Sequence, residues 1–373
     1  MHLNTDLPTV AIVFGGDSSE HQISCLTAAS VARAIDVDQF RVVGIGITRT
    51  GRWVHVPVEE IREMAVVDNV LPALSEDRLE AILHRGPHGA ELVIRDGDRL
   101  IDPVRVDVAL ALLHGPFGED GTVQGLFEMA GVRYVGSGVA ASAIGMDKHL
   151  MKLVFSAQAL PVGPYVAISP REWATDRAAA LDAVASLHFP VYVKPARGGS
   201  SMGISRVERM EDVEAAIDKA RDFDPKVLVE QGFVDCREIE CGVLGSLESP
   251  TAEASVPAEI RMHTEDGFYD FEAKYLPDEQ VSLDVPADIL PEVADRVREM
   301  AVKAFHALDG EGLARVDFFV DRQGEAWINE INTMPGFTAL SMFPRMWEHS
   351  GLAYPDLITR LITLALNRPL GLR

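Results

Sequence analysis

Apolar runs and helical patterns alternate along the first third of the chain. The apolar runs at 10–14, 42–47 and 106–113 have the composition and length of buried strands. Helical periodicity occurs at 24–34, between the first two runs, and at 122–130, after the third. Strands that alternate with helices in this way predict a parallel α/β sheet.

Polar residues gather where two of these runs end. The first run leads into two glycines and a polar segment that ends at Glu20. The third run leads into His114, Glu119 and Asp120, although Asp120 would serve equally well as a cap for the next helix. Open α/β sheets bind ligands at the carboxyl ends of their strands, so we expect a ligand site at this edge.

Two further units follow in the sequence pattern. A helical pattern at 147–158 is followed by the stretch 161–164, which begins and ends with proline. After this stretch we expect helices at 175–187 and 211–221, and strands at 191–194, 204–207 and 227–230. The third unit is expected to contain a strand at 238–244, a helix at 291–308 and a hairpin at 316–332. The polar and aromatic stretch 264–283 has the length of a lid or a binding loop.

Residues 194–203 form a glycine-rich segment between two of the expected strands. The segment begins with Lys194 and continues through small residues whose amides can turn inward, which is typical of a phosphate-binding loop. It is not a Walker loop, because no lysine and hydroxyl residue follow the glycines at the start of a helix. A flexible hairpin loop is the plainer interpretation.

Two other motifs point to different enzyme classes. Residues 199–203 match the G-x-S-x-G pattern of serine hydrolases, with Ser201 as the nucleophile, but that motif needs a helix directly after it and 204–207 has the pattern of a strand. Residues 136–141 match the dinucleotide pattern G-x-G-x-x-A, but no acidic residue ends a following strand about twenty residues later. Neither class is favoured.

The strand expected at 227–230 offers features that suit a nucleotide. It ends in Glu230, which could bind a ribose hydroxyl, and the extended segment 231–233 can present backbone donors and acceptors to a flat base. Glu238 is a second candidate for a polar contact with a nucleotide. For either acid alone, a solvated strand end is the more ordinary explanation.

The hairpin expected at 316–332 carries three oxygen-bearing side chains on neighbouring apolar strands. These are Asp317, Glu330 and Asn332. Mg²⁺ prefers such hard ligands and takes one or two carboxylates, leaving its other positions to water and substrate phosphates. The alternative is a half-exposed strand, which also alternates polar and apolar residues.

The composition limits the compartment and the class of partner. The 373 residues suggest two or three domains, and the formal net charge of −23 argues against non-specific binding to nucleic acid or to an anionic membrane. A polyphosphate ligand would therefore have to be bound by nearby cationic side chains, backbone amides and a metal ion. The three cysteines show no metal-ligand spacing and their number is odd, so we expect no disulfide framework. Without a leader-like N-terminus or a run of membrane-spanning length, we expect a cytoplasmic protein.

Together, these motifs resemble the D-alanine:D-alanine ligase family of the ATP-grasp superfamily, almost from end to end. The segments that carry the resemblance are 15–20, 114–125, 136–138, 146–148, 194–203, 237–241, 269–275, 315–317 and 329–336. The resemblance implies an α/β, three-domain ATP-grasp architecture. Its parts would be an N-terminal domain with an open parallel sheet at 1–137, a central subdomain at 138–229 and a C-terminal subdomain with the metal site and a mobile lid loop at 230–373.

The implied activity is ATP-dependent ligation of two D-alanines to D-alanyl-D-alanine through an acyl phosphate, for peptidoglycan precursor synthesis. Two Mg²⁺ ions, replaceable by Mn²⁺, would be held by Asp317, Glu330 and Asn332. The nucleotide would contact Lys148, Lys194, Ser201, Glu230, Gln231, Gly232, Phe233, Glu238, Phe268, Lys274 and Asn329. The substrates would be bound or activated by Glu20, His114, Ser200, Tyr275, Arg315, Gly336, Ser341 and Met342.

The resemblance also implies a homodimer, formed through the N-terminal domain. A D-alanine:D-lactate ligase is the nearest alternative activity, since the nucleotide and metal positions do not report the acceptor. The pair Lys274 and Tyr275 favours the dipeptide. A serine hydrolase and a non-catalytic nucleotide sensor are alternatives from other classes, and neither would release phosphate from ATP together with a ligated product.

Overall fold

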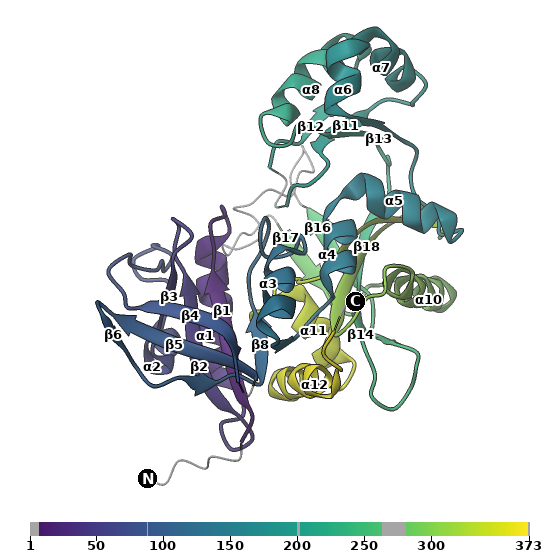
Figure 1. The fold of residues 1–373 in the computed structure, drawn as a ribbon. Helices are drawn as coiled ribbons and strands as arrows, with labels where there is room; N and C mark the ends of the chain where they lie inside the picture. The colour runs from purple at the N-terminus through teal and green to yellow at the C-terminus, as the bar shows by residue number, and fades with distance from the viewer. Residues whose placement is uncertain (1–6, 88, 200–201, 263–280, 372–373) are drawn as a thin grey trace.

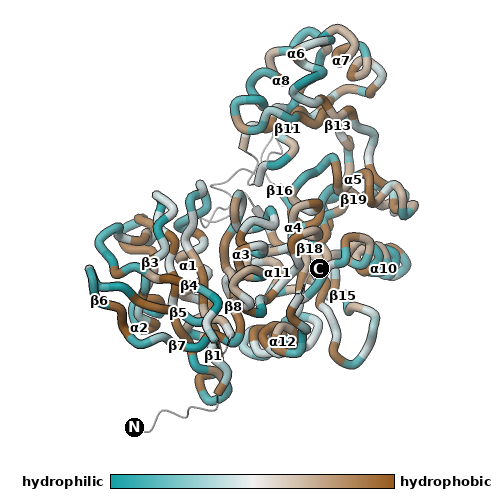
Figure 2. The backbone as a smooth tube through the Cα atoms, viewed as in Figure 1, coloured by the Kyte–Doolittle hydropathy of each residue, from teal (hydrophilic) through white to brown (hydrophobic). Residues whose placement is uncertain are grey.

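The computed structural model describes residues 7–87, 89–199, 202–262 and 281–371. Three β-sheets follow one another along this part of the chain, each covered by helices (Figure 1). Hydrophobic positions follow the strands, whereas hydrophilic and hydrophobic positions alternate along the helices α6 (Pro170–Thr175), α7 (Arg177–Val184) and α8 (Val213–Arg221) (Figure 2). In the described part of the chain, no helix combines the length and apolar character that crossing a lipid bilayer requires.

The first sheet is mixed rather than purely parallel. Four strands pair in parallel, namely β2 (Arg41–Ile47), β1 (Thr9–Gly15), β8 (Val108–Ala111) and β9 (Arg133–Tyr134). The expected parallel order holds for these strands, which lie beside α1 (His21–Ala34) and α3 (Thr122–Ala130), although β8 is shorter than the apolar run at 106–113.

Residues 53–105 extend this sheet with antiparallel strands that the sequence pattern did not predict. They are β3 (Trp53–His55), β4 (Glu80–Gly86), β5 (Gly89–Asp96), β6 (Arg99–Leu100) and β7 (Val104–Arg105), with α2 (Val58–Glu63) between the first two. The predicted parallel pairing is therefore confirmed for the central strands, and the sheet as a whole is mixed. The antiparallel strands are short or only half-buried and carry charged residues, so no apolar run marks them.

The second sheet is antiparallel and has the order β10 (Tyr165–Ile168), β13 (Val227–Gln231), β11 (Val191–Pro195) and β12 (Ser205–Val207). The helix expected at 175–187 is α7, which is shorter than predicted and begins after Asp176, because that side chain caps it by accepting from the amide of Ala179. The separate helix α6 ends just before it. The helix expected at 211–221 is a short 3-10 turn followed by α8.

The third sheet has the order β17 (Val281–Asp284), β16 (Ala258–Met262), β14 (Arg237–Leu244), β18 (Leu313–Val320) and β19 (Ala326–Asn332), with β15 (Glu253–Ala254) paired to β14. The hairpin expected at 316–332 is confirmed as β18 and β19. One core joins this sheet to α10 (Pro291–Ala307), α4 (Val139–Met146) and α5 (Lys148–Ala157).

The C-terminal helices connect the third sheet to the first. Residues of α11 (Met342–His349) and α12 (Tyr354–Asn367) share one core with β1, α1 and β8. In Figure 1 these helices lie between the N-terminal sheet and the strands β14 and β18. This packing brings the carboxyl ends of β1 and β8 toward the hairpin of β18 and β19.

Candidate active site

A cavity of about 920 Å³ is lined by strand residues of the second and third sheets, and by residues of α1 and of the loops that follow β1 and β8 of the first sheet. Every predicted site residue that the structure describes lines this cavity: Glu20, His114, Lys148, Lys194, Glu230, Gln231, Gly232, Phe233, Glu238, Arg315, Asp317, Asn329, Glu330, Asn332, Gly336, Ser341 and Met342. Ser200, Ser201, Phe268, Lys274 and Tyr275 lie outside the described residues, as does most of the predicted lid loop at 264–283.

The β18 and β19 hairpin presents its polar side chains to the cavity because a bulge interrupts its register. Asp317 pairs with Glu330, but the next residue, Phe318, pairs with Ile328, so the ladder skips Asn329. A bulge of this kind turns side chains that strict alternation would separate. Here it leaves Ile328 and Ile331 buried, although they are three positions apart.

Asp317 is held in place by two neighbours. The Arg315 guanidinium donates to both of its carboxylate oxygens, from Nε and from a terminal nitrogen at 2.7 Å each. The Asn332 amide donates to Oδ2 at 3.0 Å. Arg315 also contacts Glu240, with Nε 3.3 Å from Oε2. The pKa of Arg315 is raised well above its usual value, because these carboxylates outweigh the effect of burial.

The donor set of this hairpin suits a magnesium ion that is shared with phosphate. Among the residues that the structure describes, no group of three or more His, Cys, Asp or Glu side chains could enclose a metal by itself. Asp317 and Glu330, with the amide of Asn332, supply hard oxygens on one hairpin and leave further positions to water and a ligand. A site of this composition fits Mg²⁺ bound together with a polyphosphate.

Lys148 connects this hairpin to the glycine-rich segment. Its Nζ lies 3.3 Å from Glu330 Oε2 and donates to the carbonyl of Gly198 at 2.9 Å. Its backbone amide donates to the carbonyl of Ala196, also at 2.9 Å. The cation is therefore fixed between the Glu330 carboxylate of the hairpin and the loop that is expected to hold phosphate.

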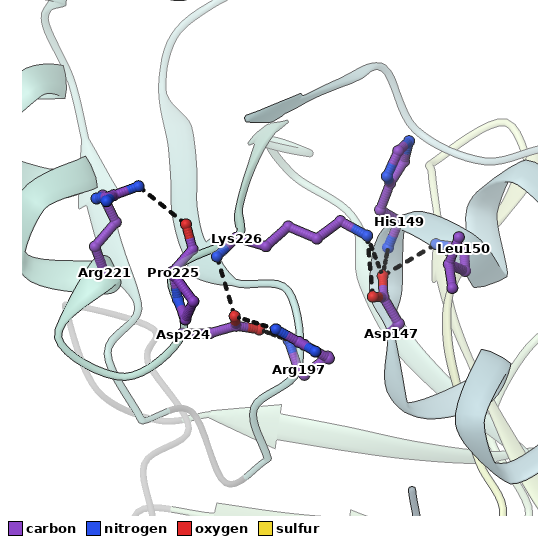
Figure 3. A network of polar contacts seen from close by, with 8 residues as sticks. All are labelled: Asp147, His149, Leu150, Arg197, Arg221, Asp224, Pro225 and Lys226. Atoms are coloured by element: carbon purple, nitrogen blue, oxygen red, sulfur yellow. Dashed lines mark hydrogen bonds and ion pairs between the residues drawn. The ribbon is translucent and has the colours of Figure 1, made fainter. Parts of the chain in front are cut away.

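A polar network holds the start of α5 against the second sheet (Figure 3). Asp147 caps α5 by accepting from the amides of His149 and Leu150, and both of its oxygens accept from Lys226 Nζ at 2.9 Å. Asp224 accepts two hydrogen bonds from the Arg197 guanidinium, at 2.8 and 2.9 Å, and one from the Lys226 amide. These contacts fix the first residues of the glycine-rich segment.

Glu230 lies buried between two lysines. Lys152 Nζ is 2.8 Å from Oε1, and Lys194 Nζ forms an ion pair with Oε2. Burial alone would raise the pKa of Glu230, but Lys152 and Lys194 outweigh it and lower the pKa to about 2. Lys152 is not among the residues predicted from the sequence. Its position four residues after Lys148 on one helix was the available signal.

Aromatic rings form the wall of the cavity beside 231–233. Phe233 stacks on Phe319 with ring centroids 5.0 Å apart and meets Trp327 at 5.1 Å. The amide of Gly232 donates to the carbonyl of Pro190, which fixes the segment as extended backbone. A flat apolar surface next to extended backbone is a suitable place for a base.

Glu20 lies at the meeting point of three loops. A Cβ atom on Gly115 would come within 3.0 Å of Glu20 Oε2, and one on Gly199 within 3.4 Å. Both loops therefore lie against the Glu20 carboxylate, and Gly115 also has a positive φ of +75° that favours glycine. Gly199 belongs to the glycine-rich segment, so the ligand edge of the first sheet and the expected phosphate loop share one site.

Glu119 and His114 complete this end of the cavity. Glu119 Oε2 accepts from the amide of Gly115 at 2.6 Å. Burial and the nearby charge of Glu20 raise the pKa of Glu119 to about 8, whereas burial lowers the pKa of His114 against the opposing effect of Glu20. Because Glu119 stays protonated at neutral pH, Glu20 is the acid at this end of the cavity that can receive a cationic ligand. The sequence placed Glu119 at the ligand edge without a role.

The N-terminus of α11 faces the same cavity. Ser341 is its N-cap residue, and its hydroxyl accepts from the amide of Thr338 at 3.1 Å. Gly336 lies close by, since a Cβ there would be 3.3 Å from Ser341 Oγ. Helix N-termini favour anions such as carboxylates, so this end of the cavity can receive a carboxylate.

The alternative enzyme classes lack the local structure that they need. The strand β12 follows the glycine-rich segment, so the described chain has no helix there to form a hydrolase elbow. The motif at 136–141 does precede a helix, α4, but that helix leads directly into α5 rather than into a strand ending in an acid.

Comparisons with known proteins agree along the whole chain. Two family models match, described as D-ala D-ala ligase N-terminus, over residues 9–137, and D-ala D-ala ligase C-terminus, over residues 154–363. The D-alanine–D-alanine ligase of Kocuria rhizophila is 51% identical over 99% of this chain and 96% of its own length. That of Kineococcus radiotolerans is 52% identical over 98% of each chain.

Solved structures give the same result. The D-alanine–D-alanine ligase of Coxiella burnetii superimposes with a TM-score of 0.81 at 29% identity, covering 97% of this chain and 95% of that one. The VanG D-Ala:D-Ser ligase of Enterococcus faecalis also gives 0.81, at 32% identity, covering 96% of this chain and 100% of that one.

Proposed function

The chain belongs to the D-alanine–D-alanine ligase family, and from this premise we propose how its cavity carries out the reaction. The fold is ATP-grasp, and the activity is the ATP-dependent ligation of two D-alanines for peptidoglycan precursor synthesis. Two questions follow from the structure: which residues hold each reactant, and how the bond is formed.

The reaction proceeds in two displacements. A carboxylate oxygen of the first D-alanine attacks the γ-phosphorus of ATP, the bond to ADP breaks, and an acyl phosphate forms. The amine of the second D-alanine, after losing a proton, attacks the acyl carbon through a tetrahedral intermediate. Phosphate then leaves with the electron pair of the broken C–O bond. Both steps develop negative charge on oxygen, so preset donors accelerate them.

The nucleotide lies between the second and third sheets. Lys148 and Lys194 bind its phosphates, and Glu230 and Glu238 contact the nucleoside. The extended segment Gln231, Gly232 and Phe233 runs along the base. The fixed position of Lys148 between Gly198 and Glu330, and the aromatic wall around Phe233, support this arrangement.

Magnesium is held by Asp317, Glu330 and Asn332, with Asn329 beside them. When bound, two Mg²⁺ ions, replaceable by Mn²⁺, would neutralise charge on the phosphates. The oxygen donors of the hairpin and the bulge that turns them support this proposal. Arg315 keeps the Asp317 carboxylate oriented through its two hydrogen bonds.

The first D-alanine lies near Glu20, which receives its ammonium, with His114 beside it. Arg315 and the backbone amide of Gly336 stabilise the oxyanion of the intermediate. The carboxylate of the second D-alanine binds Ser341 at the N-terminus of α11, and Met342 lines its methyl pocket. The buried acid Glu20 at one end and the N-terminus of α11 at the other, where no side chain caps the helix, support opposite charges at these two ends.

Five residues of the proposal lie outside the described part of the chain. From the family resemblance, Ser200 and Tyr275 connect to Glu20, and Ser201, Phe268 and Lys274 contact the nucleotide. The loop at 264–283 would close the site against water, which protects an acyl phosphate from hydrolysis. The approach of Gly199 to Glu20 supports the first of these connections.

We also propose that the protein acts in the cytoplasm as a homodimer formed through residues 1–137. The buried, unpaired cysteines Cys25 and Cys241 are compatible with a reducing compartment. The dimer rests on the family resemblance. Light scattering of the purified protein tests it: a mass of two chains supports the proposal, and a mass of one chain contradicts it.

The single observation that carries the proposal is the pairing of Asp317 with Glu330 beside Lys148 in the shared cavity. The test is to incubate the protein with ATP, Mg²⁺ and D-alanine and to follow phosphate release and product mass. Parallel reactions add D-serine or D-lactate in equal concentration. We expect D-alanyl-D-alanine as the main product in each, and a dominant mixed product would contradict the choice of acceptor.

A further inference from the structure

We propose that Lys152 is a positioning residue for ATP: it keeps a counter-charge on Glu230, so that Lys194 is free to turn to the phosphates. This inference rests on the proposed function, because it takes the space between the second and third sheets to be the nucleotide site. It gives a role to a cavity residue that neither motif nor resemblance had singled out.

Glu230 has one cation for each carboxylate oxygen. Lys152 Nζ lies 2.8 Å from Oε1, and Lys194 Nζ contacts Oε2. The Lys152 side chain is 3% exposed and that of Glu230 is 10% exposed, so water cannot replace either partner effectively. Within this group of three side chains, two buried cations face one buried anion.

The two lysines differ in how they are attached. Lys152 lies on α5, whose residues Met151 and Phe155 belong to the core of the third sheet. Its Nζ also lies 3.4 Å from the carbonyl of Asn329 on β19 and donates to it. The start of α5 is tied to Lys226 through Asp147 (Figure 3). Lys152 is therefore held from both sides.

Lys194, by contrast, ends β11 at the entrance of the glycine-rich segment. Its described contact is the ion pair with Glu230. A phosphate that enters this segment competes with Glu230 for Lys194. Because an unpaired buried carboxylate is strongly unfavourable, Lys194 can leave only if another cation stays with Glu230. Lys152 is the cation placed to do so.

The test is Lys152→Gln, which keeps a hydrogen-bond donor and removes only the charge. Lys194 then becomes the sole counter-ion of Glu230, and we expect the KM for ATP to rise about tenfold or more. The kcat and the KM for D-alanine are expected to change less than about twofold. Lys152→Arg should restore much of the ATP affinity. Lys219→Gln, an exposed lysine on α8, is the matched control.

A double-mutant cycle separates this role from simple packing. Glu230→Gln has no buried anion to neutralise, so adding Lys152→Gln to it should change the KM for ATP less than about twofold. If Lys152→Gln alone does not fold, the test is to compare the KM for ATP of the double variant with that of Glu230→Gln. An unchanged KM in Lys152→Gln, or an equal loss in both backgrounds, would overturn the proposal.

The outcome is distinguishable from failure of the proposed function. Direct titration of the wild-type protein with ATP and Mg²⁺ measures nucleotide binding without catalysis. If the wild type binds ATP and Lys152→Gln binds it equally well, the role of Lys152 is wrong while the function stands. If the wild type does not bind ATP, the proposed nucleotide site itself is wrong.

Discussion

Asp317 and Glu330 face each other directly across the β18 and β19 hairpin, and the register then skips Asn329. This bulge is the structural reason that two carboxylates and the Asn332 amide reach one cavity. The Arg315 guanidinium donates two hydrogen bonds to the Asp317 carboxylate, so this carboxylate is oriented before any ligand binds. Preset groups of this kind avoid reorganisation during the reaction.

Removing either carboxylate tests the magnesium assignment. Asp317→Asn and Glu330→Gln are each expected to reduce kcat by about a hundredfold or more, because charge neutralisation by the metal is worth several kcal/mol. Thermal unfolding should remain cooperative, and stabilisation by ADP with Mg²⁺ should be lost. Glu325→Gln, an exposed acid on the same hairpin, is the control. Near-normal turnover at saturating Mg²⁺ would refute the assignment.

Glu119 should make the stability of the ligand-free protein depend on pH. Its pKa is raised by burial and by Glu20 from 4.5 to about 8. Between these values the unfolded chain has lost the proton while the folded protein keeps it, so the free energy of unfolding falls as pH rises. The slope from this group is at most about 1.4 kcal/mol per pH unit.

Glu119→Gln should flatten this slope between about pH 4.5 and pH 8. Denaturant unfolding at several pH values measures it, with Glu299→Gln, an exposed acid on α10, as the control. If the two variants show the same pH dependence as the wild type, Glu119 is not protonated in the folded protein.

Asp224 is expected to stabilise the base of the glycine-rich segment. Burial would raise its pKa, but the hydrogen bonds from Arg197 and Lys226 lower the pKa below the usual 3.8. Its contribution is therefore complete above about pH 4 and is lost as pH falls further. Asp224→Asn should lower the free energy of unfolding at pH 7 by roughly 1–3 kcal/mol.

The difference in the free energy of unfolding between the wild type and Asp224→Asn should become smaller at pH values below 3.8. Denaturant unfolding provides the comparison, and Asp222→Asn, a nearby acid at the end of α8, is the control. A loss for Asp224→Asn that is the same at both pH values would show that the charge of this side chain is not what matters.

Ser341→Ala tests the acceptor site at the start of α11. Loss of one hydrogen bond to a charged carboxylate is worth roughly 1.5–3 kcal/mol, so the KM for the second D-alanine should rise about tenfold or more while the KM for ATP stays unchanged. Ser350→Ala, at the other end of the same helix, is the control. Equal effects on both KM values would indicate a general disturbance instead.

Much of the fold follows from the hydrophobic pattern where strands are buried on both faces. The strands β1, β11 and β13 are close to their predicted bounds because continuous apolar runs mark them. The antiparallel strands within 53–105 have no such runs. Their half-buried, charged sequences take strand geometry from pairing with neighbours, which a single sequence does not reveal.

The site was predictable to the extent that motifs mark it. Lys152 was missed, and Glu119 was given no role, for a physical reason. A lysine on a helix and an acid before one are usually solvated, and only the packing of α5 and of the 114–121 loop takes these two side chains out of water. The bulge at Asn329 had a signal, since Ile328 and Ile331 could not both face the core on a regular strand. The domain limits at 137 and 229 stay a prediction.

Transfer of oxygen from D-alanine to phosphate tests the central account most directly. The protein is incubated with ATP, Mg²⁺ and D-alanine labelled with ¹⁸O in its carboxylate, and the released phosphate is analysed by mass. An acyl phosphate requires that each phosphate carry one labelled oxygen, in proportion to the dipeptide formed. Phosphate released without label, or dipeptide formed without phosphate, would contradict the account.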